Sequence, residues 1–452
     1  MTLRQQAEDI WQAGVAAVDS ANLVRQVVRR DEQTLHVCGE VFPLDRINRI
    51  VVVGAGKAGA GMSAGLEAAL GADLVDQKVT GWVNVPTDCI RSLRRIQLHP
   101  ARPAAVNEPT AEGVNGSECI LDLVASLTND DLCLVLISGG GSALLPAPIA
   151  GISLTDKLSV TRSLMNSGAT IQELNTVRKR LSRIKGGGLV RAAAAGRMIA
   201  LIISDVVGDP LDIIASGPTV CDSGTAQQAL SVLQRFFGTS HSGEKVPASV
   251  WRVLQDQARA TIAAAPAAIQ CRNVIIGNNR TALIAAAGRA AELGFEVRSL
   301  GTDRQGIARD VGVEFAKLCL IARDEHRSHP ICYLAGGEPI VKLTATDQPR
   351  KGGRNQEVAL AAGCHWGQID ADRMLVLSGG TDGEDGPTDA AGACFDHAVQ
   401  SESRQRGLNP IEYLDINNSY PFFEQCGGLL KCGPTHTNVM DLQIGLIASG
   451  DS

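Results

Sequence analysis

Aromatic residues are scarce in this chain, and neither sign of charge dominates it. Its 452 residues include only 8 Phe, 4 Trp and 3 Tyr, which leaves little material for stacking nucleic-acid bases. The 42 basic and 48 acidic residues give a net charge of −6, without a basic tail or a block of like charges. This composition argues against nucleic-acid binding and favours small ligands.

Sequence features of membrane-spanning segments and of zinc-binding sites are also missing. No stretch reaches the ~18 consecutive apolar residues that span a bilayer, and the first residues carry no apolar signal core. The 12 Cys are scattered without a CxxC pair, and the 8 His show no HExxH spacing. We therefore expect a cytoplasmic protein with reduced cysteines, and we do not expect a zinc enzyme.

Glycine, by contrast, is abundant, with 48 residues where about 7% would be usual. The glycines follow short β-branched runs, a pattern typical of buried parallel strands that end in loops. The clearest cases are RIVVVGAGKAG (49–59), CLVLISGGGSAL (133–144), LIISDVVGDP (201–210), YLAGGEP (333–339) and MLVLSGGTDGEDG (374–386).

Strand and helix patterns alternate along the chain, after an amphipathic helix within the first ~30 residues. The predicted strands are 50–54, 78–84, 132–137, 198–204, 273–277, 296–300, 331–335 and 373–378. The predicted helices are 57–70, 118–128, most of 155–195, 280–293, 306–322 and 354–363. Such alternation is typical of βαβ units with helices on both faces of a parallel sheet.

The chain length favours two or three domains at ~150 residues each. The polar segment 238–250 interrupts the alternation, and we predict a domain junction there. We expect an α/β domain over 1–240 and a second α/β domain over 250–452, and leave open whether the last ~50 residues pack on the first. Ligands should gather at the carboxyl ends of the strands, in a cleft between the domains.

The first candidate site is the loop Gly54-Ala-Gly56-Lys57-Ala-Gly59, which matches GxGxxG between a strand and a helix. A dinucleotide site should have an acidic residue at the end of the next strand, but that strand ends at Asn84. The Lys57 ammonium would add to the positive end of the helix dipole, which suits a phosphate or a carboxylate. The alternative is a structural turn with a solvated lysine.

The second candidate is the loop Ser138-Gly139-Gly140-Gly141-Ser142, whose glycines predict a backbone nest for phosphate oxygens. It is not a Walker A motif, because no GKS or GKT follows, and the alternative is a flexible loop. Two later strands also end in glycines, which adds four residues to the candidate nucleotide-binding set: Gly337, Glu338, Gly380 and Thr381. This recurrence is also compatible with shared strand-end chemistry alone.

Two acidic sets lie among these loops: Asp205, Asp209 and Asp212, and then Asp382, Asp385 and Asp389. Carboxylates beside phosphate-binding loops are ligands that Mg²⁺ prefers, and Asp205 and Asp382 are our candidates for it. Asp209, Asp212 and Asp389 are equally compatible with helix caps or Asx turns.

Basic residues give one further candidate. Arg354, at a predicted helix start after two glycines, offers a planar fork of donors for a phosphoryl group or a carboxylate. The alternative is an exposed arginine at a helix start, where the helix dipole disfavours it. The series Arg178, Lys179, Arg180, Arg183 and Lys185 is more typical of a solvated helix face. Lys185, before three glycines, is the one exception worth testing.

Taken together and in order, these motifs resemble the type II glycerate kinase family, whose C-terminal part is called the MOFRL domain. The resemblance runs from about residue 50 to 446. It rests on VVVGAGKAGAGM, LISGGGSALL, ELNTVRKRLSRIKGGGL, IISDVVGDPLDIIASGPT, AGGEP, GGRNQEVALA, LSGGTDGEDGPTDAAGA and GPTHTNVMDLQIGLI.

The resemblance implies an ATP- and Mg²⁺-dependent kinase that phosphorylates D-glycerate, usually on the 2-hydroxyl, in a cleft between two Rossmann-like three-layer αβα domains. It also implies that Lys57 and Arg354 match the active-site Lys and Arg of the family, and that Asp205 and Asp382 line the cleft. One departure is His99-Pro-Ala-Arg-Pro103, which lacks the Asp of the family's His-Pro-x-Pro-Asp type of segment. It leaves the substrate preference and the phosphorylated hydroxyl open.

We expect Lys57 to hold the glycerate carboxylate or the transferring phosphoryl group, and Arg354 to stabilise charge on the latter. Gly139–Gly141 would cradle nucleotide phosphates, and Asp205 and Asp382 would bind Mg²⁺ or orient the hydroxyl. The expected partners are glycerate and ATP, without nucleic acid or membrane, and a homodimer is left open. The rivals are an NAD(P)H-dependent hydroxypyruvate reductase and a non-catalytic sensor of a phosphorylated sugar acid.

Overall fold

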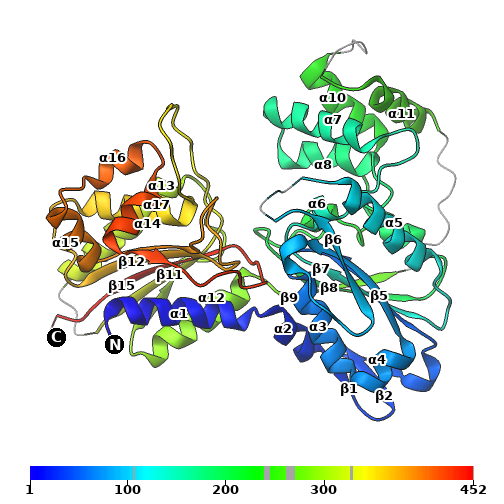
Figure 1. Ribbon diagram of the computed structural model, residues 1–452, viewed down its shortest axis with the longest axis horizontal. Helices are drawn as coiled ribbons and strands as arrows, with labels where there is room; N and C mark the ends of the chain where they lie inside the picture. Colours follow the sequence, from blue (N-terminus) through cyan, green and yellow to red (C-terminus); the bar gives the residue numbers. More distant parts are fainter. Residues whose placement is uncertain (105, 107, 239–244, 261–269, 326–328, 451–452) are drawn as a thin grey trace. The chain divides into compact units, whose positions relative to one another are not determined.

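The computed structural model describes residues 1–104, 106, 108–238, 245–260, 270–325 and 329–450 (Figure 1). The chain forms two compact units. The N-terminal unit comprises Ser20–Ile276, and the C-terminal unit comprises Gly277–Ser452 together with Met1–Asp19. The division therefore falls at residue 276 and not within 238–250, and the first 19 residues join the second unit.

The N-terminal unit is built on a six-stranded sheet with the order β6-β5-β4-β7-β8-β9. β4 pairs in parallel with β5 and β7, so the carboxyl ends of these strands lie at one edge. β5 with β6 and β7 with β8 are also parallel, which confirms the predicted parallel sheet. The strands are β4 (Ile50–Ala55), β5 (Val79–Pro86), β6 (Ile96–Arg102), β7 (Leu132–Ile137), β8 (Arg197–Ile203) and β9 (Cys271–Gly277).

Helices cover both faces of this sheet. Val51 and Val53 of β4 share a core with α5 (Ala111–Ala125) and α9 (Gly188–Ala192). On the other face, α3 (Gly59–Leu70) packs against β5, and α2 (Ser20–Val27) packs against α3. Two short helices, α4 (Ala72–Lys78) and α6 (Gly141–Leu144), also belong to this part of the unit. So does an antiparallel meander of β1 (Val28–Arg30), β2 (Thr34–Val37) and β3 (Glu40–Pro43), and sequence patterns did not predict this meander.

A group of four helices forms a separate core within the N-terminal unit (Figure 1). The helices are α7 (Leu154–Asn166), α8 (Ile171–Arg180), α10 (Ala226–Phe237) and α11 (Ala248–Arg259). Leu164, Val177, Leu233 and Trp251 contribute buried side chains to it. Because α10 and α11 pack together, the predicted junction at 238–250 is a connection inside this group, although residues 239–244 lie outside the described residues.

The C-terminal unit contains a second six-stranded sheet with the order β10-β11-β15-β12-β13-β14. This sheet is mixed and not parallel as predicted, because β15 runs antiparallel between β11 and β12. The last part of the chain therefore completes this sheet. The strands are β10 (Glu296–Ser299), β11 (Ile331–Gly337), β12 (Met374–Gly380), β13 (Gly392–Phe395), β14 (Leu429–Leu430) and β15 (Asp441–Ile447).

The strand register brings three chain segments to one edge. Asp441, the first residue of β15, lies opposite Gly337 of β11 on one side and Gly380 of β12 on the other. The loops that begin at Glu338 and Thr381 therefore leave the sheet next to Asp441.

Helices α1 (Leu3–Ala17) and α12 (Asn279–Glu292) cover one face of this second sheet, and α13 (Ala308–Asp324) and α14 (Arg354–Trp366) cover the other (Figure 1). Three further helices follow: α15 (His397–Gln405), α16 (Pro410–Asp415) and α17 (Ser419–Cys426). Among the described residues, no helix has the length and apolar character that crossing a bilayer requires.

The single amphipathic helix predicted for the first ~30 residues is in fact two helices that belong to different units. Trp11 of α1 donates a hydrogen bond to the Gly379 carbonyl of β12 at 3.2 Å. After the helix ends, the Val18 carbonyl accepts a hydrogen bond from the Thr437 hydroxyl at 2.7 Å. These contacts hold α1 on the second sheet.

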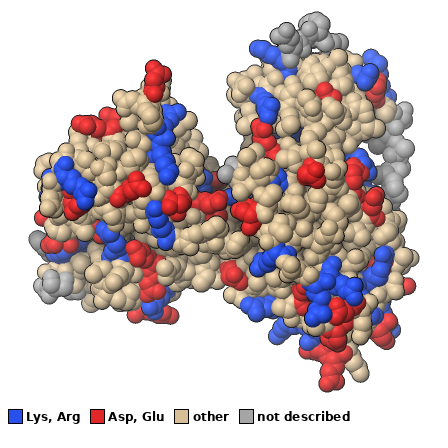
Figure 2. All heavy atoms as spheres, in the orientation of Figure 1, with Lys and Arg blue, Asp and Glu red and all other residues tan. Residues whose placement is uncertain are grey.

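Surface charges of both signs lie side by side on the face drawn in Figure 2. The ion pairs of the described residues include those of Arg30 with Asp73 at 2.7 Å and of Arg94 with Asp76 at 2.9 Å. Exposed pairs of this kind contribute little stability, about 0–1 kcal/mol each.

Candidate functional site

The two glycine-rich loops of the N-terminal unit interlock. The Lys57 amide donates to the Gly139 carbonyl at 2.9 Å, and the Ala58 amide donates to the Ser138 hydroxyl at 3.0 Å. A Cβ atom on Gly56, whose φ is +149°, would lie 2.0 Å from the Ser138 hydroxyl oxygen. Ser138 is therefore engaged in joining the two loops, and both loops act as one platform at the carboxyl edge of the sheet.

The close approach at Gly56 gives a first prediction. We expect Gly56→Ala to lower the free energy of unfolding by about 1–3 kcal/mol, because the new methyl group must displace Ser138. Gly288→Ala is the control, since Gly288 lies within α12 with open space around its Cβ position; it should be neutral or stabilise by up to ~1 kcal/mol. Urea denaturation of both variants measures the difference, and equal stability would contradict the role of Gly56.

Lys57 and Arg102 flank Gly140 on this platform. A Cβ atom on Gly140 would lie 3.3 Å from Arg102 Nη2 and 3.7 Å from Lys57 Cγ. Arg102 is only 3% exposed, and its guanidinium donates to the Val106 carbonyl at 2.5 Å. Sequence reasoning noted this segment only for its missing Asp, so Arg102 is a second cation that it did not assign to the site.

Ser142, at the end of the second loop, is surrounded by donors from helix α8 and the segment after it. Arg178 Nη2 donates to its hydroxyl at 2.7 Å, and Lys185 Nζ lies 2.9 Å from the same oxygen and 2.7 Å from the Ser142 carbonyl. The Ser216 hydroxyl is 2.9 Å away. Ser142 therefore links the glycine loop to a basic region.

The predicted solvated helix face is wrong for Lys179, which is 7% exposed; Lys185, the exception set apart from that prediction, is 2% exposed. Lys179 pairs with Asp222 at 3.3 Å and with Asp212 at 3.5 Å, and Arg180 also pairs with Asp222. Arg183 pairs with Glu118 at the surface, at 2.6 Å. Helix periodicity alone did not show that α8 buries Lys179 and brings Arg178 to Ser142.

Asp205 follows β8 and is half-buried, in the same unit as Lys57. Further along this segment, Asp209 (φ +54°), Ala215 (φ +50°) and Ser216 (φ +63°) adopt left-handed backbone conformations. Such strained residues cluster at functional sites. Asp212 has its partner in Lys179 and is an ion-pair residue.

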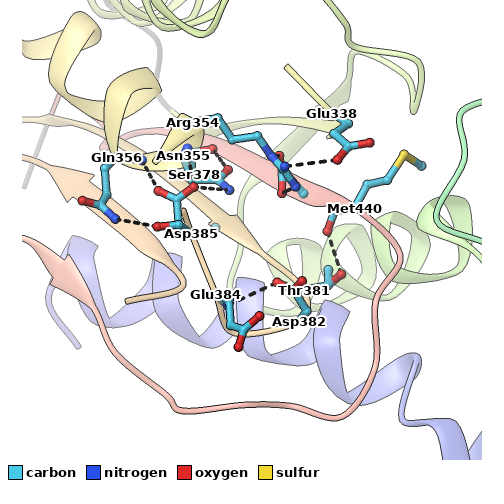
Figure 3. A network of polar contacts seen from close by, with 12 residues as sticks. Glu338, Arg354, Asn355, Gln356, Ser378, Thr381, Asp382, Glu384, Asp385 and Met440 are labelled. Carbon is cyan, nitrogen blue, oxygen red and sulfur yellow. Dashed lines mark hydrogen bonds and ion pairs between the residues drawn. The ribbon is translucent and has the colours of Figure 1, made fainter. Parts of the chain in front are cut away.

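In the C-terminal unit, Arg354 is the first residue of α14 and forms a two-pronged pair with Asp441 (Figure 3). Its Nε lies 2.6 Å from Oδ2 of Asp441, and its Nη2 lies 2.9 Å from Oδ1. A third nitrogen, Nη1, lies 3.1 Å from the Glu338 carboxylate. Burial opposes the charge on Arg354, but the carboxylates of Asp441, Glu338 and Asp385 together outweigh it and raise the pKa of Arg354, so the guanidinium is always charged.

Asp441 has no exposed side-chain surface. Sequence reasoning did not single it out, although it lies in one of the stretches that carried the resemblance. The available signal was an acidic residue at the start of a mostly apolar stretch, Asp441–Ile447.

Asp385 caps the helix that presents Arg354. Its carboxylate accepts the Asn355 amide at 3.0 Å and the Gln356 amide at 2.8 Å (Figure 3). Burial raises the pKa of Asp385 to about 7; the Asp441 carboxylate adds to this shift, whereas the two amides and the Arg354 guanidinium oppose it. A Cβ on Gly353 would lie 2.2 Å from the Asp385 carboxyl carbon, which requires glycine there. Asp385 therefore positions α14.

The loop after β12 is held by Thr381. Its buried hydroxyl donates to the Met440 carbonyl at 2.6 Å and accepts the Val439 amide at 2.9 Å. In this geometry the Thr381 hydroxyl anchors the loop to the segment before β15. Asp382, the next residue, is half-buried and accepts the Glu384 amide at 3.2 Å (Figure 3).

Asp389, from the same acidic set, belongs to a surface pair. Lys431 lies 2.8 Å from its carboxylate, and Tyr420 donates to it at 2.6 Å. These two partners hold the pKa of Asp389 at about 2. Within the described residues, no group of three or more His, Cys, Asp or Glu side chains is arranged to hold a metal ion.

A cavity of about 550 Å³ opens beside Arg354, inside the C-terminal unit. Glu338 and Arg354 line one part of it, and Ile340, Leu343 and Pro387 give it an apolar part. Arg354 therefore reaches a space that is large enough for a small ligand.

The pair between Arg354 and Asp441 gives a second prediction. We expect Asp441→Asn to lower the free energy of unfolding by about 2 kcal/mol, because the variant loses a charge-assisted two-pronged contact. Asp389→Asn, which breaks an exposed pair, should change it by less than ~0.5 kcal/mol. Urea titrations of both variants measure the free energy of unfolding. Equal losses in the two variants would show that the pair of Arg354 with Asp441 contributes no more stability than an exposed pair.

Each unit thus gathers its own share of the predicted site residues. The N-terminal unit holds Gly54, Gly56, Lys57, Ser138–Ser142 and Asp205, and the C-terminal unit holds Gly337, Glu338, Arg354 and Gly380–Asp382. Within each unit, these residues lie at the loop-bearing edge of the sheet.

Comparison with known families matches both units. The profile described as domain of unknown function DUF4147 matches residues 6–255, and the MOFRL family profile matches residues 331–441. A crystal structure of glycerate kinase from Thermotoga maritima has a TM-score of 0.82 and 32% identity, over 99% of both chains.

Individual relatives have similar lengths. A protein of Danio rerio named glycerate kinase is 37% identical, over 99% of this chain and 98% of its own length. A Thermotoga maritima protein named D-glycerate 2-kinase is 35% identical, over 90% and 93% respectively. An Agrobacterium vitis protein named "Putative hydroxypyruvate reductase" is 40% identical, over 88% and 87%.

Proposed function

This chain belongs to the glycerate kinase family, and from that premise we propose that it transfers the γ-phosphoryl group of ATP to the 2-hydroxyl of D-glycerate. The observation that carries the proposal is the pair of cationic centres at the predicted positions. Lys57 lies on a platform of glycine-rich loops, and Arg354 is held by Asp441 beside a cavity. Preorganised cations beside backbone amides are what phosphoryl transfer needs, because positioning and charge stabilisation do most of the catalysis.

In the reaction, the 2-hydroxyl oxygen of glycerate forms a bond to the γ-phosphorus, and the bond from that phosphorus to the oxygen of ADP breaks. The hydroxyl proton leaves to a carboxylate, for which Asp205 and Asp382 are the candidates. Lys57 binds the glycerate carboxylate or the moving phosphoryl group. Arg354 offsets the charge on the phosphoryl oxygens, and Asp441 and Asp385 keep its guanidinium in place.

Phosphate oxygens of ATP would be received by the amides of Gly139–Gly141. Mg²⁺ fits this site as an ion held partly by the nucleotide, because it needs only one or two protein carboxylates when substrate phosphates supply the other ligands. Asp205 and Asp382 are half-buried carboxylates at the loop edges of the two sheets and would serve in that role. When bound, the ion would neutralise charge on the phosphates.

Hydroxypyruvate reduction is the second candidate, since one relative carries that name. A nicotinamide dinucleotide in the 54–59 loop would need an acidic partner for its ribose at the end of the next strand. Sequence patterns placed that strand end at Asn84, whereas β5 continues to Pro86; Asn84 lies opposite Ala55, the last residue of β4, and is a buried residue whose amide donates to the Leu144 carbonyl at 2.8 Å. The Asn84 side chain therefore has a structural role there, which favours the kinase over the reductase.

The deciding experiment incubates the protein with D-glycerate, ATP and Mg²⁺ and follows the products by phosphorus NMR. We expect a phosphate ester on the 2-carbon together with ADP. A parallel assay with hydroxypyruvate and NADH, or NADPH, should show no loss of the reduced nicotinamide. Oxidation of the nicotinamide without phosphate-ester formation would overturn the proposal.

A further inference from the structure

Three cations interact with one another, two of them at Ser142, and within the described residues none of them pairs with an acidic side chain. They are Lys157 of α7, Arg178 of α8 and Lys185 in the segment after α8. Arg178 and Lys185 both bind the Ser142 hydroxyl, at 2.7 Å and 2.9 Å. Lys157 is 7% exposed, and its ammonium has no hydrogen-bond partner within the described part of the chain.

Burial disfavours the charge on all three, and repulsion from neighbouring cations adds to this effect at the two lysines. Burial lowers the pKa of Lys157 to about 7, and the Arg178 charge adds to this shift. Burial also lowers the pKa of Lys185 well below its usual value, with Arg178 and Lys157 adding to the effect. The charged groups that perturb these two lysines are thus other cations, Arg178 of α8 and, for Lys185, also Lys157 of α7.

The neighbouring cations of the same stretch behave differently. Lys179 and Arg180 are balanced by Asp222, and Arg183 is balanced by Glu118. Buried charges are normally paired, because an unpaired one loses its hydration without compensation. The other three cations therefore carry an energetic cost that a bound anion would relieve.

The surroundings of these cations are suited to phosphate oxygens. Hydroxyl groups of Ser142 and Ser216 lie 2.9 Å apart, and Asn175 accepts a hydrogen bond from Ser216 at 3.3 Å. Ser142 directly follows the three glycines of the platform loop, so the cations and the loop amides lie next to each other. A single carboxylate would balance only one of the three charges, whereas a phosphate ester or a phosphate chain carries several.

We propose that Lys157, Arg178 and Lys185 form a binding site for the phosphate groups of a substrate or product, with Lys157 as the residue that gains a partner only when the anion is bound. The proposal rests on the function proposed above. In that reaction, two anions could occupy the site. One is the phosphate chain of the nucleotide, and the other is the phosphate ester of the product.

Lys157→Met is the informative variant, because it keeps the length of the side chain and removes an ammonium that has no partner. We expect the variant without ligand to be as stable as the unchanged protein or more so. Its affinity for tripolyphosphate should fall at least ~10-fold, as expected for the loss of one charge-assisted contact. A lysine with only a structural role would instead lower the melting temperature and leave the affinity unchanged.

The full-length protein is titrated calorimetrically with tripolyphosphate and, separately, with 2-phosphoglycerate. Lys185→Met provides a second site variant, and Arg183→Gln is the matched control, since it removes a surface charge from the same segment. Weaker binding of tripolyphosphate assigns the site to the nucleotide, and weaker binding of 2-phosphoglycerate alone assigns it to the product. Normal binding of both anions by both lysine variants would overturn the proposal.

The same measurements separate this site from the proposed reaction. If the unchanged protein does not phosphorylate glycerate but the lysine variants lose anion binding, the site stands and the function fails. If the protein phosphorylates glycerate and both lysine variants bind both anions normally, the function stands and the site fails.

Discussion

The Arg354→Ala variant is expected to lose at least ~100-fold in kcat, the scale of removing one preorganised donor from a transition state. Two nitrogens of Arg354 are fixed by Asp441 at 2.6 and 2.9 Å, so the direction of the guanidinium is set before a substrate binds. An alanine removes the charge and leaves water in its place. Steady-state release of ADP, measured with saturating glycerate and ATP, gives the effect.

Two further variants make this result specific. Arg354→Lys should remain strongly impaired, because an ammonium lacks the planar fork that pairs with Asp441. Arg323→Ala, at a surface position of α13 beside Asp324, should keep the normal kcat. Near-normal turnover in Arg354→Ala, with a urea midpoint that shows an intact fold, would remove Arg354 from the mechanism.

Lys57→Met is expected to cost at least ~100-fold in kcat/KM for glycerate, since it removes the ammonium on the glycine platform. The fold should survive, because the contact of this residue with Gly139 is made by its backbone amide. Lys317→Met, at an exposed position of α13, is the matched control and should behave normally. A Lys57→Met enzyme with normal kcat and KM would disprove the assignment.

Combining Lys57→Met with Arg354→Ala tests whether the two cations act on one phosphoryl group. They belong to different units, so independent effects would multiply. If both groups stabilise the same transition state, the double variant should lose clearly less than the product of the two single losses. Full multiplication would indicate that they act on separate groups.

Local sequence predicted much of the secondary structure. β7 occupies 132–137, as predicted, because a continuous apolar run is followed at once by glycines. The predicted strands 50–54, 198–204 and 373–378 differ from β4, β8 and β12 by at most two residues at either end. These features depend on hydrophobic runs and on glycine, which act within a few residues along the chain.

Elements with mixed composition were harder to predict. β15 was missed because Asp441 and Gln443 interrupt its apolar pattern, yet both side chains are buried. The break between α1 and α2 was missed because both helices continue one amphipathic pattern while they cover different units. In both cases the partner surface, which lies far away in sequence, decides the structure.

The candidate site shows the same division. Residue type and spacing predicted three parts of the candidate site: the glycine loops that follow strands, Lys57, and Arg354. They could be predicted because the carboxyl ends of strands and the first turns of helices are local features. The choice of Asp441 as the partner of Arg354, 87 residues away, could not be read from such patterns. The burial of Lys157, and that of Lys185 beside Ser142, could not be read from them either.

Whether a charge is paired, buried or left without a partner depends on which distant segments fold against it. Spacing along the chain therefore determined the loops and the two cations of this kinase. Only the tertiary structure decided which carboxylate pairs with Arg354 and which lysines are buried in the proposed anion site. The reason is that electrostatic free energy depends on distances and solvent exposure in space.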